Sequence, residues 1–251
     1  MFKIRRAIIM AAGLGSRLRP ITNKIPKPLI KVNGIRMIDT VINGLIRNEI
    51  TEIHIVVGYL KEKFDVILDE YECVKTPNGS EVKINLIENP YYDKCNNISS
   101  LYVAREHLSE CVIIDGDQIL NNYNILNPNI ERSGYCSSWV EGYTNEWLQT
   151  VDSDGTVVDC SRMGGRQGWE LHGVSFWNKN DCKKLKKHLV FEFEKKNNKQ
   201  IYWDDLAMFC YRKEYNLGIR KINEDDIVEI DSIDELIEID SNYVEVKHGK
   251  N

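Results

Sequence analysis

The stretch AAGLGSRLRPITNKIPKPL, residues 11–29, follows the apolar run AIIM and combines glycine, positive charge and three prolines. Gly13 and Gly15 at the end of a strand allow the backbone to approach a phosphate closely and to direct N–H groups at it. Arg17 can bind phosphate through two hydrogen bonds, and Lys27 can act as a point charge. Lys27 lies between two prolines, and the second one favours an extended backbone for it. The pattern predicts a strand followed by an anion-binding loop.

The spacing disfavours the two most familiar phosphate-binding loops. A dinucleotide-binding fingerprint requires glycine at the position of Leu18, and a P-loop requires Gly-Lys-Ser/Thr, which the stretch lacks. The loop therefore indicates another kind of phosphate site.

The whole chain has the composition of an ordinary globular protein. Its 251 residues are enough for one large α/β domain, with 42% hydrophobic and 28% charged residues. A net charge of -5 gives no general surface for nucleic acid. Seven scattered cysteines without a CxxC pair argue against a zinc site or a disulfide framework and indicate reduced thiols in a cytoplasmic protein. Because no apolar stretch approaches the ~20 residues that cross a bilayer, no membrane insertion is expected.

Apolar runs and helical spacing alternate through the first half of the chain. Strands are expected at residues 7–12, 52–59, 81–89 and 111–117, and helices at 37–48, 61–71 and 97–108. Such alternation predicts a parallel sheet covered on both faces, with ligands at the carboxyl ends of its strands.

The second half changes to strands and hairpins. Strands are expected within residues 135–141, 146–162 and 172–178, and helices at 181–196, 203–214 and 232–239. Ser232 and Glu235 have the spacing of a capping box. Trp139 and Trp177 fall in apolar strand patterns, which predicts core positions for both.

Every element of the opening stretch matches one family signature. From Met10 to Leu29, the pattern A-A-G-x-G-x-R-L-x-P-x-T followed by P-K-P-L resembles that of nucleotidyltransferases that join a nucleoside triphosphate to a phosphorylated metabolite. The resemblance implies a Rossmann-like α/β fold, a mostly parallel mixed sheet flanked by helices, with a smaller substrate-binding lid region. One domain then spans residues 1–251, with a nucleotide-binding core at 1–120 and an acceptor-binding, metal-completing part at about 121–251.

Shorter motifs resemble one branch of this family, the bacterial CTP:phosphocholine cytidylyltransferases. They are NNISSLYVAREHL, IIDGDQIL, YTNEWLQ, LHGVSFWN, IYWDDL and EIDSIDEL, and the likeness runs from about residue 6 to about residue 240. One departure is Asp115-Gly116-Asp117, where the family commonly has Asp-Ala-Asp, but both acids are kept. The resemblance implies that CTP and phosphocholine react to CDP-choline and pyrophosphate, with Mg²⁺ as the cofactor.

The resemblance also implies which residues form the site. Asp117 and Asp231 would be the Mg²⁺ ligands, although from the residues alone each could equally shape a turn or a helix start. Arg17 and Lys27 would be catalytic, because they neutralise the phosphates. The nucleotide contacts that it implies are Ala12, Gly13, Leu14, Gly15, Ser16, Asn89, Asn97, Ser100 and Asp115. No general base is required, since a phosphomonoester is largely dianionic at neutral pH.

Aromatic residues mark the second half of the chain. Any one of them is commonly a core residue, but Trp147 lies in TNEW, and Tyr202 and Asp204 lie in YWDD, both motifs of the resemblance. Aromatic faces with a nearby carboxylate hold quaternary ammonium groups. We therefore expect Trp147, Tyr202 and Asp204 to contact the choline head group.

Three other functions stay open. A cytidylyltransferase for 2-aminoethylphosphonate or phosphoethanolamine would use the same kind of site. A sugar-1-phosphate nucleotidyltransferase is disfavoured by the aromatic motifs. A nucleotide-sensing module without catalysis is disfavoured by the intact basic and acidic residues of the expected site.

Overall fold

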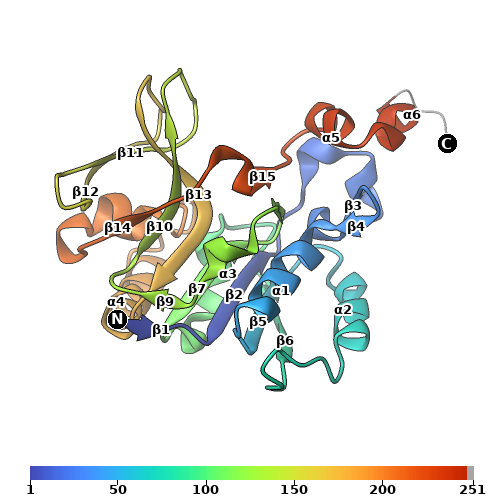
Figure 1. Cartoon of the computed structure of the whole chain (residues 1–251), viewed down its shortest axis with the longest axis horizontal. Helices are drawn as coiled ribbons and strands as arrows, with labels where there is room; N and C mark the ends of the chain where they lie inside the picture. The colour runs from blue at the N-terminus through green and yellow to red at the C-terminus, as the bar shows by residue number, and fades with distance from the viewer. Residues whose placement is uncertain (248–251) are drawn as a thin grey trace.

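The computed structural model describes residues 1–247, and its centre is a nine-stranded sheet (Figure 1). Four strands are parallel, in the order β7-β2-β5-β6, and β13 pairs antiparallel to β7. These strands are β2 (Arg6–Ala11), β5 (Glu52–Val57), β6 (Lys83–Glu88), β7 (Cys111–Asp115) and β13 (Gly168–Trp177). The expected Rossmann-like mixed sheet is confirmed, and its purely parallel part is the N-terminal half.

Further strands extend the sheet beyond β13 and form two-stranded ribbons elsewhere. In the sheet, β10 (Gly134–Val140) pairs with β13 and β14 (Gly218–Lys221), while β11 (Leu148–Val151) lies between β13 and β12 (Val157–Ser161). The ribbons join β1 (Phe2–Lys3) to β9 (Asn129–Ile130), β3 (Lys31–Val32) to β4 (Ile35–Arg36), and β8 (Gln118–Leu120) to β15 (Ile227–Glu229). We call the part built from β10 to β14 the β-lobe.

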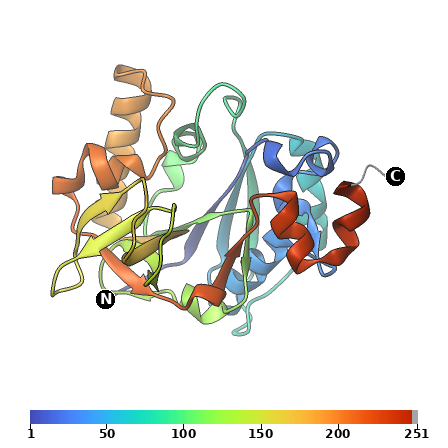
Figure 2. The same ribbon diagram turned by 90° about the horizontal axis from the view of Figure 1, so that it is seen from above.

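Helices flank the parallel strands on both faces (Figures 1 and 2). They are α1 (Met37–Arg47), α2 (Asp65–Glu70), α3 (Ile98–Val103) and α4 (Lys179–Val190), with α5 (Ile233–Ile239) and α6 (Val244–Lys247) near the C-terminus. Within residues 1–247, no helix is long and apolar enough to cross a membrane.

Several expected helices are shorter than their sequence pattern. The helix expected at 97–108 ends at Val103 and is followed by a 3-10 turn. The one expected at 181–196 widens into a π-helical turn, Phe191–Lys195, in which the consecutive residues Glu192 and Phe193 are both buried. The one expected at 203–214 is reduced to a π-helical turn, Leu206–Cys210, and a short 3-10 turn.

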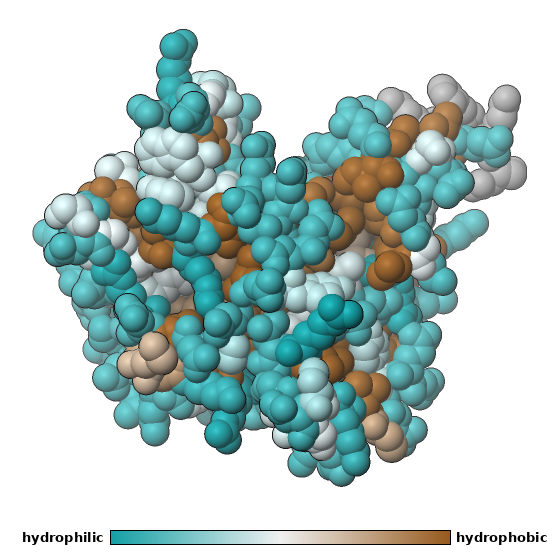
Figure 3. All heavy atoms as spheres, viewed as in Figure 1, coloured by the Kyte–Doolittle hydropathy of each residue, from teal (hydrophilic) through white to brown (hydrophobic). Residues whose placement is uncertain are grey.

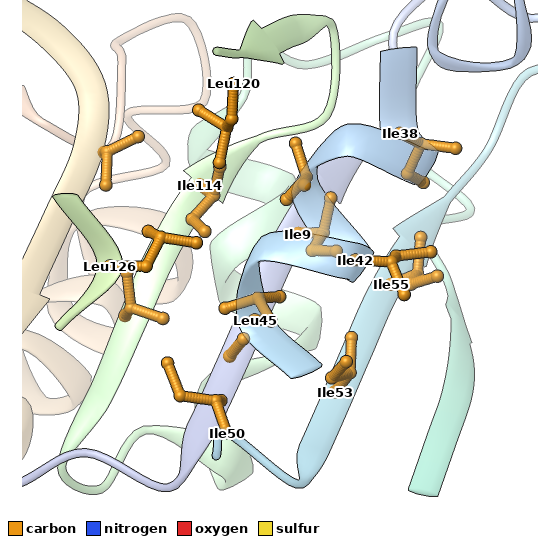
Figure 4. Packing of buried hydrophobic residues seen from close by; sticks show 14 of the residues in the cluster. Ile9, Ile38, Ile42, Leu45, Ile50, Ile53, Ile55, Ile114, Leu120 and Leu126 are labelled. Carbon is orange, nitrogen blue, oxygen red and sulfur yellow. The ribbon is translucent and has the colours of Figure 1, made fainter. Parts of the chain in front are cut away.

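The core lies on both faces of the parallel strands, because successive side chains of a strand point to opposite sides. Ile9 of β2 packs in the cluster that contains Ile42 of α1 (Figure 4). Its neighbour Ile8 packs in a second cluster, with Leu101 of α3 and Leu185 of α4. This double burial explains why the strand before the glycine loop is an uninterrupted apolar run.

A third cluster joins residues 227–243, which we call the C-terminal segment, to the part of the chain that follows β2. Leu18 and Leu236 belong to this cluster, and both are buried. The Tyr243 hydroxyl donates a hydrogen bond to the Lys31 carbonyl at 2.6 Å. The C-terminal segment therefore holds the residues that follow the glycine loop in place.

Of the local features expected in the second half, the capping box and the buried Trp177 are confirmed, but the position of Trp139 is not. The capping box at Ser232 and Glu235 is present at the start of α5, and Trp177 is fully buried. The core position expected for Trp139 is wrong, because its side chain is 44% exposed. It packs edge-on against Trp169, its cross-strand partner near the outer end of β10, at a ring distance of 5.2 Å. An apolar strand pattern does not reveal where a strand leaves the core.

A close backbone approach between β10 and β14 gives a stability prediction. A Cβ atom on Gly134 would lie directly against the backbone carbonyl of Gly218 in β14. We expect Gly134→Ala to lower the free energy of unfolding by more than ~2 kcal/mol in urea denaturation. Gly142→Ala is the matched control, because a Cβ there has no neighbour within 4 Å, and we expect a change below ~0.5 kcal/mol. Equal urea midpoints for the two variants would contradict the close approach of β10 and β14.

Candidate active site

A cavity of about 550 Å³ opens at the carboxyl ends of β2 and β7. A smaller cavity of about 250 Å³ lies over the glycine loop and shares Gly13, Asp117 and Asp231 with the larger one. Figure 3 shows the molecule hollowed between the β-lobe and the C-terminal segment. The two cavities therefore lie at the edge of the sheet where ligands are expected.

The glycine loop has the backbone that its sequence predicts. Gly15 adopts a left-handed conformation, with φ of 58°, and a Cβ there would lie 3.0 Å from Thr22 Cγ2. The Thr22 hydroxyl also donates a hydrogen bond to the Gly15 carbonyl at 2.9 Å, which fixes the turn. Ala12 and Gly13 line the larger cavity, while Leu14, Gly15 and Ser16 line the smaller one.

Lys27 is the centre of the charge network. Its side chain is only 7% exposed, and its Nζ lies 2.7 Å from Asp117 Oδ2 and 2.9 Å from Asp231 Oδ1. Arg17 Nη1 lies 2.8 Å from the other oxygen of Asp231. Burial alone would lower the pKa of Lys27, but the two carboxylates outweigh it and raise that pKa above its usual value. The expected extended backbone at Lys27 is wrong, because it begins a 3-10 turn that directs Nζ between the two acids.

Sequence reasoning missed one acid of this cluster, Glu229. Carboxylate oxygens of Asp117, Glu229 and Asp231 all lie within 4.8 Å of one another. Burial, and next the charges of Asp117 and Asp231, raise the pKa of Glu229 to about 7. Mg²⁺ prefers oxygen ligands, and a cation would relieve the repulsion among these acids, so the residues fit that ion. The spacing of Glu229 and Asp231 was the sequence signal that could have identified Glu229. Alternate residues of a strand point to the same face of the sheet, so the two acids are expected on one side.

Three of the residues expected to contact the nucleotide lie together, two of them at the start of α3 and one after β6. Ser100, Asn97 and Asn89 all line the larger cavity, as does Ser99, which the sequence did not single out. Asn89 Nδ2 donates hydrogen bonds to both serine hydroxyls, each at 3.0 Å. Asn97 Oδ1 accepts a hydrogen bond from the Trp203 backbone N–H at 2.9 Å. Asn97 therefore ties α3 to the segment that contains Tyr202 and Asp204, instead of capping the helix with its side chain.

The three residues expected at the head group also meet in the larger cavity. Trp147 comes from the β-lobe, and Tyr202 and Asp204 come from the loop before the π-helical turn. The rings of Trp147 and Tyr202 are 5.8 Å apart at 84°, and Tyr202 is 48% exposed. Two aromatic surfaces at a right angle therefore line the cavity together with a carboxylate, an arrangement that suits an organic cation.

Asp204 differs sharply from its neighbour Asp205. Asp205 is buried, and its Oδ1 lies 2.5 Å from Arg162 Nη2. In contrast, Asp204 forms no salt bridge with any residue of the range 1–247. Burial raises the pKa of Asp204 to about 7, and the nearby Tyr135 hydroxyl partly opposes this shift. The pocket thus presents a carboxylate whose charge a bound cation would stabilise.

Asp115 lies between the two ends of the site. It lines the larger cavity, and burial raises its pKa well above the usual range, with further increases from the charges of Asp117, Asp204 and Glu229. Asp115 therefore lies between the acid cluster of Asp117 and Glu229 and the carboxylate of Asp204.

Comparison with known proteins adds independent evidence. The family model described as nucleotidyl transferase matches residues 6–132. A 2-aminoethylphosphonate cytidylyltransferase of Lancefieldella rimae is 36% identical over 95% of this chain and 93% of its own length. A choline-phosphate cytidylyltransferase of Streptococcus pneumoniae is 34% identical over 91% and 93%. The solved structure of the CTP:phosphocholine cytidylyltransferase from Streptococcus pneumoniae superposes with a TM-score of 0.84 at 33% identity, over 96% of this chain and 99% of that one.

The raised pKa of Asp204 gives a pH-dependent stability prediction. An acid with a folded pKa of about 7 and an unfolded pKa of ~3.9 binds the extra proton in the folded state, so stability falls as the pH rises between these values. Asp204→Asn removes this cost. We expect the variant to gain on the order of 2 kcal/mol of unfolding free energy at pH 8 and almost nothing at pH 4, measured by urea denaturation.

The exposed turn residue Asp154 provides the control for this experiment. Asp154→Asn should change stability by a similar small amount at both pH values. A gain from Asp204→Asn that is the same at pH 4 and pH 8 would refute a destabilising ionised Asp204.

Proposed function

The chain belongs to the nucleotidyl transferase family and is a cytidylyltransferase, and we propose that it transfers CMP from CTP to phosphocholine, releasing pyrophosphate and forming CDP-choline. The observation that carries the choice of acceptor is the arrangement of Trp147, Tyr202 and Asp204. Their two rings and one unpaired carboxylate provide cation–π attraction and a counter-charge for a trimethylammonium group.

The proposed reaction is an in-line displacement at phosphorus. An oxygen of the acceptor's phosphate attacks the α-phosphorus of CTP and forms the new P–O–P bridge. The bond from the α-phosphorus to the bridging oxygen of the β-phosphate breaks, and pyrophosphate leaves. Because the attacking phosphate is already ionised at neutral pH, the chain needs to supply alignment and charge stabilisation but no general base.

Arg17 and Lys27 are the positively charged side chains that the protein contributes to this site. Both line the cavity over the glycine loop, and both are paired with carboxylates before substrates bind. We propose that they turn toward the triphosphate and stabilise the charge that grows on the departing pyrophosphate. Asp117, Glu229 and Asp231 would then be free to hold Mg²⁺, which offsets the repulsion between the two reacting anions.

A second acceptor, 2-aminoethylphosphonate, is favoured by a different observation. The larger cavity is lined by the carboxylates of Asp115, Asp204 and Glu229, which can accept hydrogen bonds from a primary ammonium. The Lancefieldella rimae relative also has this substrate in its name. Phosphoethanolamine carries the same ammonium on a phosphate ester and belongs to the same alternative.

The cluster of acids gives a prediction about the metal. We expect Asp117→Asn and Asp231→Asn to lower kcat by at least ~100-fold with the fold intact, because each removes one ligand charge at the reacting phosphates. The measurement is pyrophosphate release at saturating Mg²⁺, with circular dichroism to verify folding. The surface variant Asp225→Asn should retain full activity, and near-normal kcat in an Asp117 or Asp231 variant would remove that residue from the metal site.

The proposed function itself is tested by a substrate panel. CTP should exceed UTP, ATP and GTP in kcat/KM. Phosphocholine should exceed 3,3-dimethylbutyl phosphate, its uncharged isostere, by roughly two to three powers of ten, because two rings and one acid together contribute a few kcal/mol. It should also exceed phosphoethanolamine and 2-aminoethylphosphonate, whose primary ammonium loses hydration against an aromatic wall.

Matched tryptophan variants show whether the cavity aromatics cause this selectivity. Trp147→Ala should shrink the gap between phosphocholine and its uncharged isostere, whereas Trp169→Ala, in the surface pair with Trp139, should leave it unchanged. A primary-amine acceptor that equals or exceeds phosphocholine would replace the choline proposal with the second acceptor.

A further inference from the structure

Arg162 connects two parts of the cavity wall, those that carry Trp147 and Tyr202, although it does not line the cavity itself. It follows β12 and is not among the residues that line the larger cavity. Its Nε and Nη2 donate hydrogen bonds to Asp205 Oδ1, at 3.0 Å and 2.5 Å. Any effect of Arg162 on a bound substrate must therefore pass through the residues that it contacts.

Through Asp205, Arg162 holds the loop that carries Tyr202 and Asp204. The second oxygen of Asp205, Oδ2, accepts a hydrogen bond from the Tyr202 backbone N–H at 3.0 Å. Asp205 is only 3% exposed, and a buried carboxylate is costly without a counter-charge, so the guanidinium of Arg162 stabilises this arrangement. The ion pair therefore fixes the backbone from which the Tyr202 ring extends.

The guanidinium of Arg162 also contacts aromatic rings on the other side. Its Cζ lies 3.9 Å from the centre of the Phe209 ring and 5.7 Å from the centre of the Trp147 ring, both within the range of a cation–π contact. Phe209 packs edge-on against Trp147, at a ring distance of 5.3 Å and an angle of 77°. Trp147 belongs to the β-lobe, so the Arg162 side chain joins a ring of that lobe to the loop of Asp205.

The separation of the two cavity rings suits one ammonium group. An ammonium is attracted by an aromatic ring when it lies within about 6 Å of the ring centre. The ring centres of Trp147 and Tyr202 are 5.8 Å apart. A single head group can therefore contact both rings as long as the β-lobe and the loop keep this distance.

We propose that Arg162 is a positioning residue, which keeps Trp147 and Tyr202 at the distance at which one ammonium group contacts both rings. It thereby sets the affinity for the acceptor without touching the acceptor. This inference rests on the proposed cytidylyl transfer to an acceptor with an ammonium group, and it applies to phosphocholine and to 2-aminoethylphosphonate alike.

The test removes the ion pair without leaving a buried charge. In the double variant Arg162→Met with Asp205→Asn, the asparagine oxygen can still accept the hydrogen bond from the Tyr202 N–H, but the methionine cannot hold the loop as a guanidinium does. For the acceptor that the wild-type enzyme uses, we expect KM to rise at least about tenfold. We expect kcat and the KM for CTP to stay within about twofold of wild type, because only the binding of the remote head group is weakened. The Kd of the corresponding CDP product, measured by calorimetry, should rise with the acceptor KM.

Two further variants separate positioning from a general loss of stability. Arg162→Lys should bring the acceptor KM back to within about threefold of wild type, because both guanidinium nitrogens bond the same carboxylate oxygen and a point charge can replace them. The matched control is Arg212→Met with Asp159→Asn. It removes an exposed ion pair of the same two residue types, with an N–O distance of 2.7 Å, and should leave all these constants unchanged.

The outcomes separate this inference from the function on which it rests. A folded double variant whose acceptor KM stays within about twofold of wild type overturns the role of Arg162, and so does an equal loss in kcat, the KM for CTP and the acceptor KM. A wild-type enzyme that uses neither phosphocholine nor 2-aminoethylphosphonate overturns the proposed function, and this inference with it.

A single variant tests the same connection if the double variant does not fold. Phe209→Leu keeps the ion pair but removes the ring that lies against both Arg162 and Trp147. We expect the acceptor KM to rise at least about threefold, with kcat unchanged. An unchanged acceptor KM in this variant overturns the positioning role.

Discussion

The ammonium of Lys27 lies between two carboxylates that are distant from it in the sequence, Asp117 by 90 residues and Asp231 by 204. This ion pair joins the glycine loop, the end of the central strand β7 and the C-terminal segment. Without Lys27 between them, the like charges of Asp117 and Asp231 would repel each other at the edge of the sheet. A buried cation between the two carboxylates offsets their mutual repulsion, so both acids can lie at one edge of the sheet in the folded chain.

Many residues of the site could be predicted because they belong to short local sequence patterns. The glycine loop and its basic residues follow from the order of residues 11–29, and Asp117 follows from the end of a second apolar run, residues 111–117. Glu229 was missed although it stands two residues before Asp231, because its place beside Asp117 depends on the pairing of β15 with β8, which brings together residues that are more than 100 positions apart. Trp139 was misplaced for a related reason, since the pattern of a strand does not reveal where its neighbours end.

The part of the larger cavity lined by Trp147, Tyr202 and Asp204 shows how adjacent residues of one type can take different roles. Asp204 and Asp205 are chemically identical and consecutive, yet Arg162 neutralises only Asp205. The paired acid anchors the loop to the β-lobe, while the unpaired acid faces the cavity beside Trp147 and Tyr202. The local sequence identifies the motif but does not show which of the two acids is paired. The cation that pairs with Asp205 is Arg162, which follows β12 and is distant in the sequence.

The contact between the C-terminal segment and the glycine loop also means that the site can be completed only late in the synthesis of the chain. Asp231 is added 204 residues after Lys27, which at about 5–20 residues per second is roughly 10–40 s later. The parallel strands β5, β6 and β7 are all completed within that interval, while Lys27 and the apolar side chain of Leu18 still lack their late partners. Until the C-terminal segment is made, the growing chain therefore has Lys27 without its ion pair to Asp231 and Leu18 without its packing partner Leu236.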